Sequence, residues 1–346
     1  MGVESTSTEK PLLDVRNLSV SFRQEDGVVS IVDNVSFTVG AREILSIVGE
    51  SGSGKSMTSL ALMRLITDPN AILSGSVLYK GRDLLGLGSH EMRNLRGREI
   101  AMIFQDPMTA MTPVYTIGWQ IEEQIRAHQN ISRRAALARA VELLGEMGIP
   151  DPARAAQRYP HQLSGGMRQR AMIAMALSCK PSLLIADEPT TALDVTVQAQ
   201  ILEIIQRLRT DFGSSVILIT HDMGVVSSVS DRVMVMYAGT IAEQGQKSAV
   251  LARPGHPYTL GLLQSIPPMH GVKPHRLPSI PGSPPAPTSR SAGCPFQLRC
   301  EFRFEKCDQR PPLLQSGGQQ VACYLAQEKL PDWTRERAIR AKVQVE

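Results

Sequence analysis

The sequence lacks the features that mark several common classes of protein. None of its apolar runs reaches the roughly 18 to 20 residues that a helix needs to cross a bilayer; the best, at 171–177 and 216–220, are short. Its net charge is only +4, which is too mild to indicate a nucleic-acid-binding surface. Its start lacks the basic and apolar segments of a secretory signal. We therefore expect a chain that neither spans a membrane itself nor is exported, and that binds no nucleic acid.

Length and composition indicate an ordinary folded chain. A length of 346 residues is typical of about two domains, and 20% charged with 42% hydrophobic residues argues against long disorder. Gly2 and Thr6 match the myristoylation pattern, but the pattern is short, and a flexible polar tail is the preferred interpretation.

Cysteine is scarce and unevenly placed. One of the five, Cys179, stands alone beside an apolar segment and is expected to be a small core residue. The other four lie between residues 294 and 323. Disulfides are rare in chains that are not exported, so these four thiols are expected to be reduced or to bind a metal.

The hydrophobic pattern predicts an α/β fold with a helical insertion. After residue 250 prolines accumulate and the cysteines follow, so we place a domain boundary there, between 1–250 and 251–346. The expected elements are a β-hairpin at 12–22 and 31–39, buried strands at 43–48, 183–186 and 216–219, and helices at 57–65, 119–148, 172–177 and 197–208.

Three motifs carry the chemistry. The segment GESGSGKS, residues 49–56, follows a predicted strand, precedes a helix and fits the phosphate-binding loop GxxxxGK[ST]. The apolar segment LLIA then ends in Asp187 and Glu188, which is how P-loop ATPases place a carboxylate for Mg²⁺ and a second one for an attacking water. Between them, Ser164, Gly165 and Gly166 open a predicted helix, whose N-terminus favours an anion.

With these motifs in order, residues 12–250 resemble the ATP-binding subunits of ABC transporters. The resemblance implies a P-loop (RecA-like) ABC ATPase core with an antiparallel β subdomain, a helical subdomain at about 106–165 and a small Cys-containing C-terminal extension. It also assigns an ATP-binding role to Phe22, which stacks on adenine, to Gly49, Ser51, Gly52, Ser53, Gly54, Lys55 and Ser56 of the loop, to Ser164, Gly165 and Gly166 of the signature, and to Asp194 of the D-loop.

The same resemblance implies a catalytic arrangement. Glu188 is expected to be the general base, His221 to position the water and the γ-phosphate, and Gln105 to assist. Mg²⁺ is expected to bind to Ser56, Gln105 and Asp187. Two cassettes would pack head to tail, so that residues 164–166 serve the nucleotide of the partner.

The C-terminal segment narrows the resemblance to importers of oligopeptides and dipeptides, through HPYTLGLL at 256–263, PGSPP at 281–285 and GCPFQLRC at 293–300. Such a subunit is expected to energise import of di- or oligopeptides from the cytoplasmic face of the cell membrane as a peripheral protein. Its expected partners are a second ATPase subunit, usually a paralogue, two transmembrane permease subunits and an external peptide-binding protein. The segment 108–117 is a candidate permease contact, the alternative being an apolar packing loop.

The four clustered cysteines leave three alternatives open. A [4Fe-4S] cluster held by Cys294, Cys300, Cys307 and Cys323 is favoured, because no pair has the close spacing of structural zinc sites and the resemblance permits such a cluster. Zn²⁺ and free thiols remain alternatives. The alternative for the whole chain is a soluble ABC ATPase acting on DNA or ribosomes, although the short distance from Lys55 to Ser164 and the single cassette favour the transporter.

Overall fold

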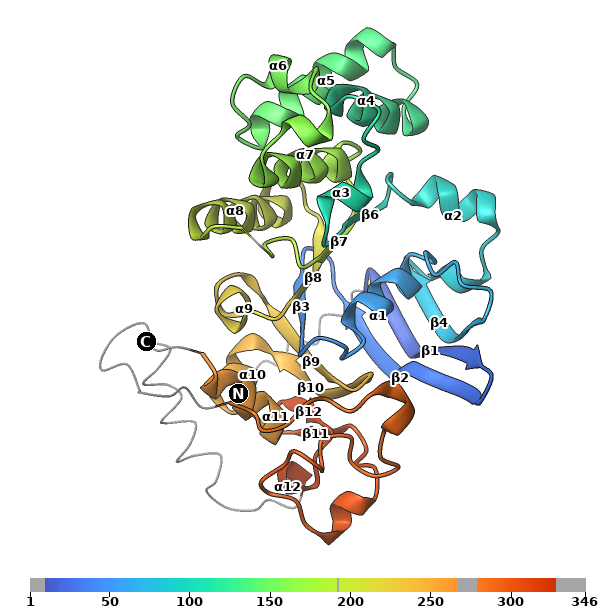
Figure 1. Cartoon of the computed structure of the whole chain (residues 1–346), viewed down its shortest axis with the longest axis vertical. Coiled ribbons are helices and arrows are strands. Elements are labelled where there is room, and N and C mark those ends of the chain that lie inside the picture. The colour runs from blue at the N-terminus through green and yellow to red at the C-terminus, as the bar shows by residue number, and fades with distance from the viewer. Residues whose placement is uncertain (1–9, 192, 267–278, 328–346) are drawn as a thin grey trace, which may run out of the picture.

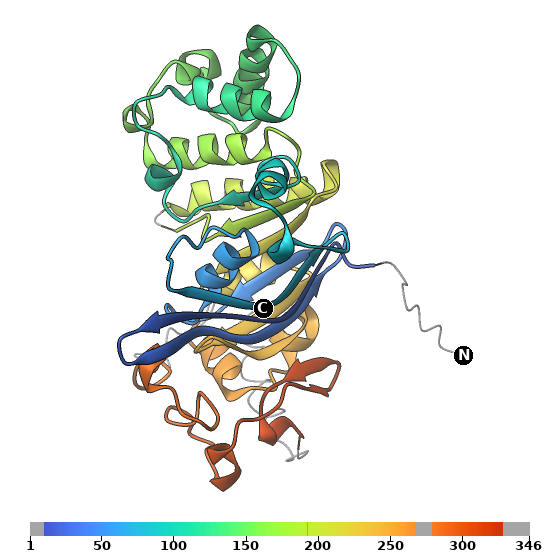
Figure 2. The same ribbon diagram turned by 90° about the vertical axis from the view of Figure 1, so that its right-hand side faces the viewer.

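Three parts follow one another along the long axis of the molecule (Figure 1). The computed structural model describes residues 10–191, 193–266 and 279–327. A helical lobe lies at the top, the central sheet and an antiparallel sheet lie in the middle, and the C-terminal extension lies at the bottom; Figure 2 shows the same order from the side. Gly2 and Thr6 of the myristoylation pattern lie outside the described residues.

The central sheet is built on the apolar segments that the sequence marked as buried strands. Its strands β3, β7 and β8 are buried throughout, as expected for parallel strands that are covered on both faces. Along β7, Leu184 contributes to the core under the helical lobe, while Ile185 contributes to the core under the antiparallel sheet. Within the described residues the strand order is β11-β12-β10-β9-β3-β8-β7-β6. The bounds are β3 (Ile44–Val48), β6 (Ile100–Ile103), β7 (Leu183–Asp187), β8 (Ser215–Thr220), β9 (Arg232–Tyr237) and β10 (Thr240–Gln246), with α8 (Val195–Asp211) and α9 (Met223–Val229) on connections between them.

The predicted hairpin is confirmed as part of a separate antiparallel sheet. β1 (Leu13–Gln24) pairs with β2 (Gly27–Val39) and, on its other side, with β4 (Ala71–Tyr79). Buried residues such as Val20 on β1 and Val35 on β2 join the core that α1 (Lys55–Leu62) and β3 also enter. The remaining elements here are β5 (Arg82–Asp83), the 3-10 helix η1 (Leu84–Gly86) and α2 (Ser89–Leu95).

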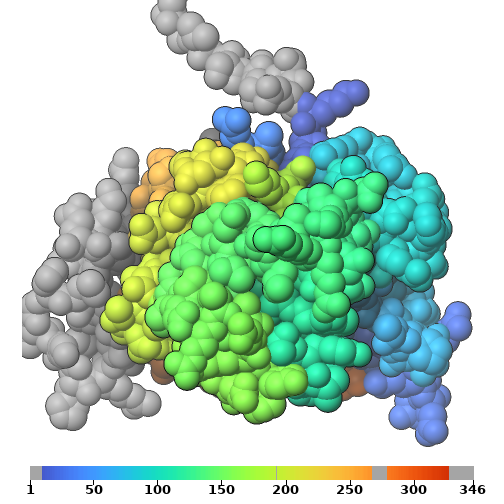
Figure 3. Space-filling model, turned by 90° about the horizontal axis from the view of Figure 1, so that it is seen from above, coloured from blue at the N-terminus to red at the C-terminus, as the bar shows by residue number. Residues whose placement is uncertain are grey.

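The helical lobe includes the predicted insertion, about 106–165, and extends beyond it to Leu177; Figure 3 shows the lobe covering much of the upper surface. The predicted helix at 119–148 is two helices, α4 (Ile117–His128) and α5 (Arg133–Glu146). The break is fixed by Ser132, whose hydroxyl accepts a hydrogen bond from the N–H of Ala135 at 3.2 Å and so starts a new helix. The lobe also contains α3 (Pro107–Ala110), α6 (Pro152–Ala156), η2 (Pro160–Gln162) and α7 (Gly165–Leu177).

The C-terminal extension continues the central sheet. β12 (Gln319–Val321) pairs with β10 and with β11 (Leu314–Ser316), adding two strands at this edge. The predicted boundary near residue 250 falls within α10 (Lys247–Ala252). The extension further contains α11 (Pro257–Gln264), η3 (Pro287–Ser289), η4 (Glu305–Asp308) and α12 (Tyr324–Gln327). No helix of the described segments combines the length and the apolarity that traversing a membrane requires.

A buried carboxyl joins the extension to the sheet and should make stability depend on pH. Glu243 is fully buried on β10, and its oxygens accept hydrogen bonds from the N–H groups of Gly255 at 2.7 Å and His256 at 3.1 Å. Burial raises the pKa of Glu243 from 4.5 to about 7. Between these values the folded protein holds a proton that the unfolded chain has released. The free energy of unfolding, compared with that of Glu243→Gln, should therefore fall by about 3 kcal/mol as the pH rises from 4.5 to 7. Urea unfolding of both proteins at pH 5 and pH 8 measures this; an equal difference at both pH values would contradict it.

Candidate functional site

The phosphate-binding loop, residues 49–56, runs from the end of β3 into α1. Gly52 and Gly54 have φ angles of 77° and 100°, which only glycine adopts without strain. Gly54 caps α1, so the helix starts at Lys55, two residues before the predicted start. The loop thus turns its backbone towards the N-terminus of a helix, where N–H groups have no partner within the helix and an anion is favoured.

Lys55 is buried and folded back onto its own loop. Its Nζ donates to the carbonyl oxygens of Gly49 at 2.8 Å and Glu50 at 2.9 Å. Burial lowers the pKa of the Lys55 ammonium, although three nearby carboxylates favour its charged form. The ammonium of Lys55 therefore lies within the loop, where it can bind an anion.

Asp187 and Ser56 bring oxygen ligands together from two parts of the chain. The hydroxyl of Ser56 donates to Oδ1 of Asp187 at 3.1 Å. Burial raises the pKa of Asp187, and the hydrogen bond from Ser56 opposes this shift. A hydroxyl and a carboxylate are hard oxygen ligands of the kind that Mg²⁺ prefers, so these two residues fit the expected ion.

Glu188 connects the predicted catalytic residues. Nε2 of Gln105 donates to its Oε2 at 3.0 Å, and Nδ1 of His221 lies 3.4 Å from its Oε1. Gln105, Glu188 and His221 follow β6, β7 and β8, which are neighbouring parallel strands whose carboxyl ends meet at one edge of the sheet. The structure therefore brings together all three residues that the sequence assigned to catalysis.

The remaining predicted ATP-binding residues lie elsewhere. Ser164 caps α7 by accepting from the N–H of Met167 at 3.3 Å, and Figure 1 shows α7 in the helical lobe, apart from α1. Asp194 caps α8 by accepting from the N–H of Val197 at 2.9 Å. Phe22 is half-buried on β1 and packs against the core of the antiparallel sheet.

The structure does not support the predicted iron–sulfur cluster or its zinc alternative. Cys294, Cys300 and Cys307 belong to one apolar cluster, whereas Cys323 packs with another, beside Val321. Burial raises the pKa of Cys294, that of Cys300 to about 11 and that of Cys323 to about 12, and neighbouring thiols raise each of these further. Among the described residues no group of three or more His, Cys, Asp or Glu side chains is arranged to hold a metal ion. The structure therefore gives no support to a metal site at these thiols, and Cys179, expected in the core, is only half-buried.

Two features of the site were not predicted. Thr191 donates its hydroxyl to Oε2 of Glu188 at 2.9 Å and helps to fix the carboxylate. Glu50 of the phosphate-binding loop is held by Arg299 and Tyr258 of the extension. The acid inside a phosphate-binding loop was the only sign of this contact in the sequence, since nothing around Arg299 pointed to the loop.

Gly49 is the position in the loop where a side chain should do most damage to the fold. Its φ is 155°, and an added Cβ would collide with the carbonyl oxygen of Met236. Gly49→Ala should therefore lower the free energy of unfolding by about 3 kcal/mol. Gly52→Ala is the matched control, because Gly52 also has positive φ but its Cβ would meet open space, so about 1 kcal/mol is expected. Thermal unfolding compares the two; equal losses would contradict the collision.

Comparison with protein families matches two parts of the chain. Residues 32–191 match the family model described as "ABC transporter". Residues 242–307 match the model described as "Oligopeptide/dipeptide transporter, C-terminal region". The first match includes the phosphate-binding loop and Glu188, and the second includes Tyr258 and Arg299.

Similar proteins cover nearly the whole chain. A putative peptide import ATP-binding protein of Brucella abortus is 52% identical over 90% of this chain and 94% of its own length. Oligopeptide transport ATP-binding proteins OppD are 47% identical in Haemophilus influenzae, over 92% of this chain and 98% of that one, and in Bacillus subtilis, over 96% and 94%. A dimeric ATP-binding cassette, solved in a post-hydrolysis state with ADP and Pi, is 26% identical with a TM-score of 0.62, over 68% of this chain and 98% of that one.

Proposed function

Because the chain belongs to the ATP-binding subunits of ABC transporters, in the oligopeptide/dipeptide branch, we propose that it hydrolyses ATP to drive import of di- or oligopeptides through a membrane transporter. The observation that carries the proposal is the convergence of Gln105, Glu188 and His221 at the strand edge that also holds the phosphate-binding loop. The names of the relatives favour a peptide importer over an ATPase acting on DNA or ribosomes.

The phosphate-binding loop would hold the phosphates of ATP. The backbone of residues 49–54 would surround the phosphates, and Lys55 would exchange its bonds to the carbonyl oxygens of Gly49 and Glu50 for phosphate oxygens. Ser56, Asp187 and Gln105 would hold Mg²⁺, which supplies positive charge beside the phosphates. Phe22 is proposed to stack on the adenine.

Hydrolysis would depend on Glu188 as the general base. Its carboxylate would accept the proton of the attacking water, while Gln105 and Thr191 hold it in place through the hydrogen bonds already described. The side chain of His221 is 62% exposed and reaches Glu188 from the end of β8, so it is free to orient the water and the γ-phosphate.

A second cassette would complete the site. Ser164, Gly165 and Gly166 lie at the start of the 13-residue helix α7, away from the phosphate-binding loop of their own chain. We propose that they bind the nucleotide of a second, paralogous subunit, and that Asp194 lies at the contact between the two. The N-terminal end of α7 carries partial positive charge suited to a phosphate.

The helical lobe would contact the permease. Just after Gln105, the segment 108–117 exposes apolar side chains: Met108 is 40%, Tyr115 44% and Val114 70% exposed. Tyr115 stacks on Trp119 of α4 at a ring distance of 3.9 Å, which gives this surface a rigid base. We propose that it binds the two transmembrane subunits at the cytoplasmic face of the membrane, with an external binding protein delivering peptide from the other side.

Isolation of the native complex tests the proposal. Affinity purification of the chain from detergent-solubilised membranes is expected to recover two integral membrane subunits, a second cassette and, after cross-linking, an external peptide-binding protein. Val114→Asp should abolish that recovery, whereas Leu137→Asp, on the exposed face of α5, is the control that should not. Recovery of ribosomes or DNA in place of membrane subunits would contradict the proposal.

A further inference from the structure

The C-terminal extension contacts the phosphate-binding loop at Glu50, from two sides. The hydroxyl of Tyr258, on α11, accepts a hydrogen bond from the N–H of Glu50 at 2.8 Å. The guanidinium of Arg299 holds the carboxylate of Glu50 with both arms, at 2.6 Å and 3.0 Å. The carbonyl oxygen of Glu50 meanwhile accepts from Nζ of Lys55. Glu50 thus connects the extension directly to the lysine of the loop.

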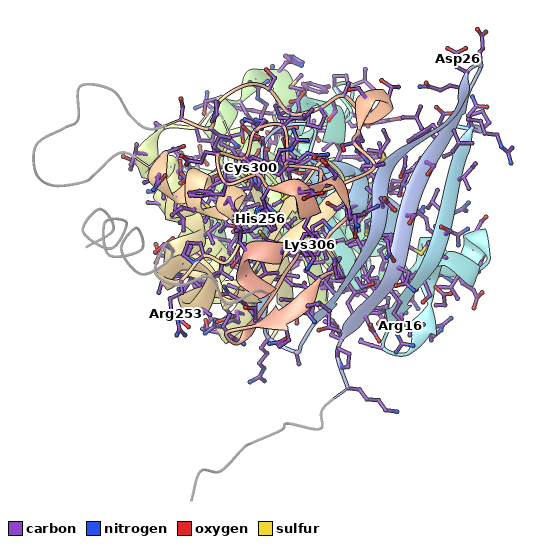
Figure 4. The ribbon with its side chains drawn as sticks, turned by 90° about the horizontal axis from the view of Figure 1, so that it is seen from below. Arg16, Asp26, Arg253, His256, Cys300 and Lys306 are labelled. Atoms are coloured by element: carbon purple, nitrogen blue, oxygen red, sulfur yellow. The ribbon has the colours of Figure 1, made fainter. Side chains whose placement is uncertain are left out.

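Arg299 is fixed in place before it reaches the loop. Its side chain is only 6% exposed, and its guanidinium also donates to the carbonyl oxygens of Pro281 at 2.7 Å and Gly282 at 3.3 Å. The rings of Tyr237 and Phe296 lie 5.8 Å and 6.0 Å from its guanidinium carbon. Figure 4 shows the neighbouring Cys300 within the folded extension. These contacts fix the guanidinium of Arg299 in the position from which it binds Glu50.

The contact between Arg299 and Glu50 matters for nucleotide binding because Glu50 is negatively charged. A carboxylate in a loop that must receive the anionic phosphates of ATP would repel them if it were unpaired. The carboxylate is close enough to Lys55 to act on its charge, and its side chain is 29% exposed, so water screens it only partly. A bidentate partner such as Arg299 both neutralises the carboxylate and fixes its direction.

We propose that Arg299 neutralises and holds Glu50, so that the C-terminal extension sets the affinity of the phosphate-binding loop for nucleotide. This inference rests on the proposed function. Arg299 is a positioning residue in this scheme, because it touches the loop and not the nucleotide. If the extension only stabilised the fold, the hydrogen bonds from Arg299 to Pro281 and Gly282 would suffice, and its two bonds to Glu50 would not be needed.

The affinity of the purified full-length chain for MgADP, measured by calorimetry, separates charge from bracing. Arg299→Gln keeps N–H donors but loses the charge, and should weaken binding about tenfold. Arg299→Lys keeps the charge and should stay within about threefold of the native chain. Adding Glu50→Gln to Arg299→Gln removes the unpaired carboxylate and should restore affinity to within about threefold of Glu50→Gln alone.

The matched control is Arg310→Gln, since Arg310 also links the extension to the cassette, through Asp33 on β2 at 2.6 Å, but does not touch the loop. Native affinity in Arg299→Gln, an equal loss in Arg310→Gln, or a double variant as weak as Arg299→Gln would each overturn the inference. A native chain that binds no MgADP would instead contradict the proposed function and, with it, this inference.

A second test uses the native chain and so does not depend on the correct folding of a variant. Coupling between sites is reciprocal, so MgADP should tighten the extension as the extension tightens the loop. Cys300 is half-buried next to Arg299, and its alkylation by iodoacetamide should slow about fivefold in saturating MgADP. An unchanged rate would overturn the inference.

Discussion

Replacing Glu188 by glutamine is expected to reduce ATP hydrolysis by the assembled transporter by about 10²- to 10⁴-fold, the usual contribution of a positioned general base. The amide has the same shape but cannot accept the proton of the attacking water. Affinity for MgATP should change by less than about threefold, since the hydrogen-bond and ion-pair partners of the carboxylate are Gln105, Thr191 and His221, which lie outside the loop. Phosphate release and nucleotide titration measure the two quantities separately.

The matched control for Glu188→Gln is Glu203→Gln. Glu203 is an exposed acid on α8, and its replacement should leave hydrolysis at the native rate. Loss of nucleotide binding together with hydrolysis would contradict the assigned role, because it would mean that Glu188 maintains the site and does not act on water. Hydrolysis above a tenth of the native rate would exclude Glu188 as the base.

Replacing Lys55 by alanine is expected to weaken MgATP binding roughly a hundredfold, or about 3 kcal/mol, because the loop loses the buried ammonium that would bind the phosphates. Alanine is a strong helix former at the first position of α1, so the fold should persist. Removing the ammonium also leaves the carbonyl oxygens of Gly49 and Glu50 without this donor. Calorimetric titration gives the affinity, and circular dichroism checks the fold.

Lys80→Ala is the control for Lys55→Ala. The side chain of Lys80, between β4 and β5, is 47% exposed, and its ammonium pairs with Glu99 at 2.8 Å. An exposed pair of this kind contributes at most about 1 kcal/mol. Nucleotide affinity should be native in this variant. Native affinity in Lys55→Ala would contradict the assignment of residues 49–56 as the loop that binds the phosphates.

The predictions from the sequence were most accurate where a functional motif lies at the end of a predicted strand. Apolar runs that are buried on both faces, such as β7 and β8, leave few alternatives, and the residues that follow them had to meet at one edge. The meeting of Glu188 and His221 followed from that arrangement, whereas Gln105 follows β6, a strand that was not predicted, and was assigned to the site by the resemblance alone. Boundaries were predicted less accurately: the break before α5 depends on one cap at Ser132, which the periodicity of 119–148 did not reveal.

The extension could not be predicted in the same way because its contacts are long-range. Arg299 and Glu50 are 249 residues apart, and no local pattern links them. Cys323 lies two residues after the end of β12, so the pairing of that strand with β10 places it, and sequence spacing alone could not show whether its thiol would join the other three. The expectation of a metal cluster rested on that spacing and on the resemblance, and no group of side chains arranged to hold a metal ion is found in the described part of the chain.

Peptide uptake by the purified transporter, reconstituted in vesicles with its external binding protein, tests the central claim most directly. When this subunit and ATP are inside the vesicle, peptide is expected to accumulate in the vesicle interior, which corresponds to the cytoplasm. Lys55→Ala should abolish the accumulation, while Lys80→Ala should leave it intact. Peptide uptake that proceeds at the native rate with Lys55→Ala, or ATP hydrolysis by the native complex with no movement of any peptide, would contradict the account.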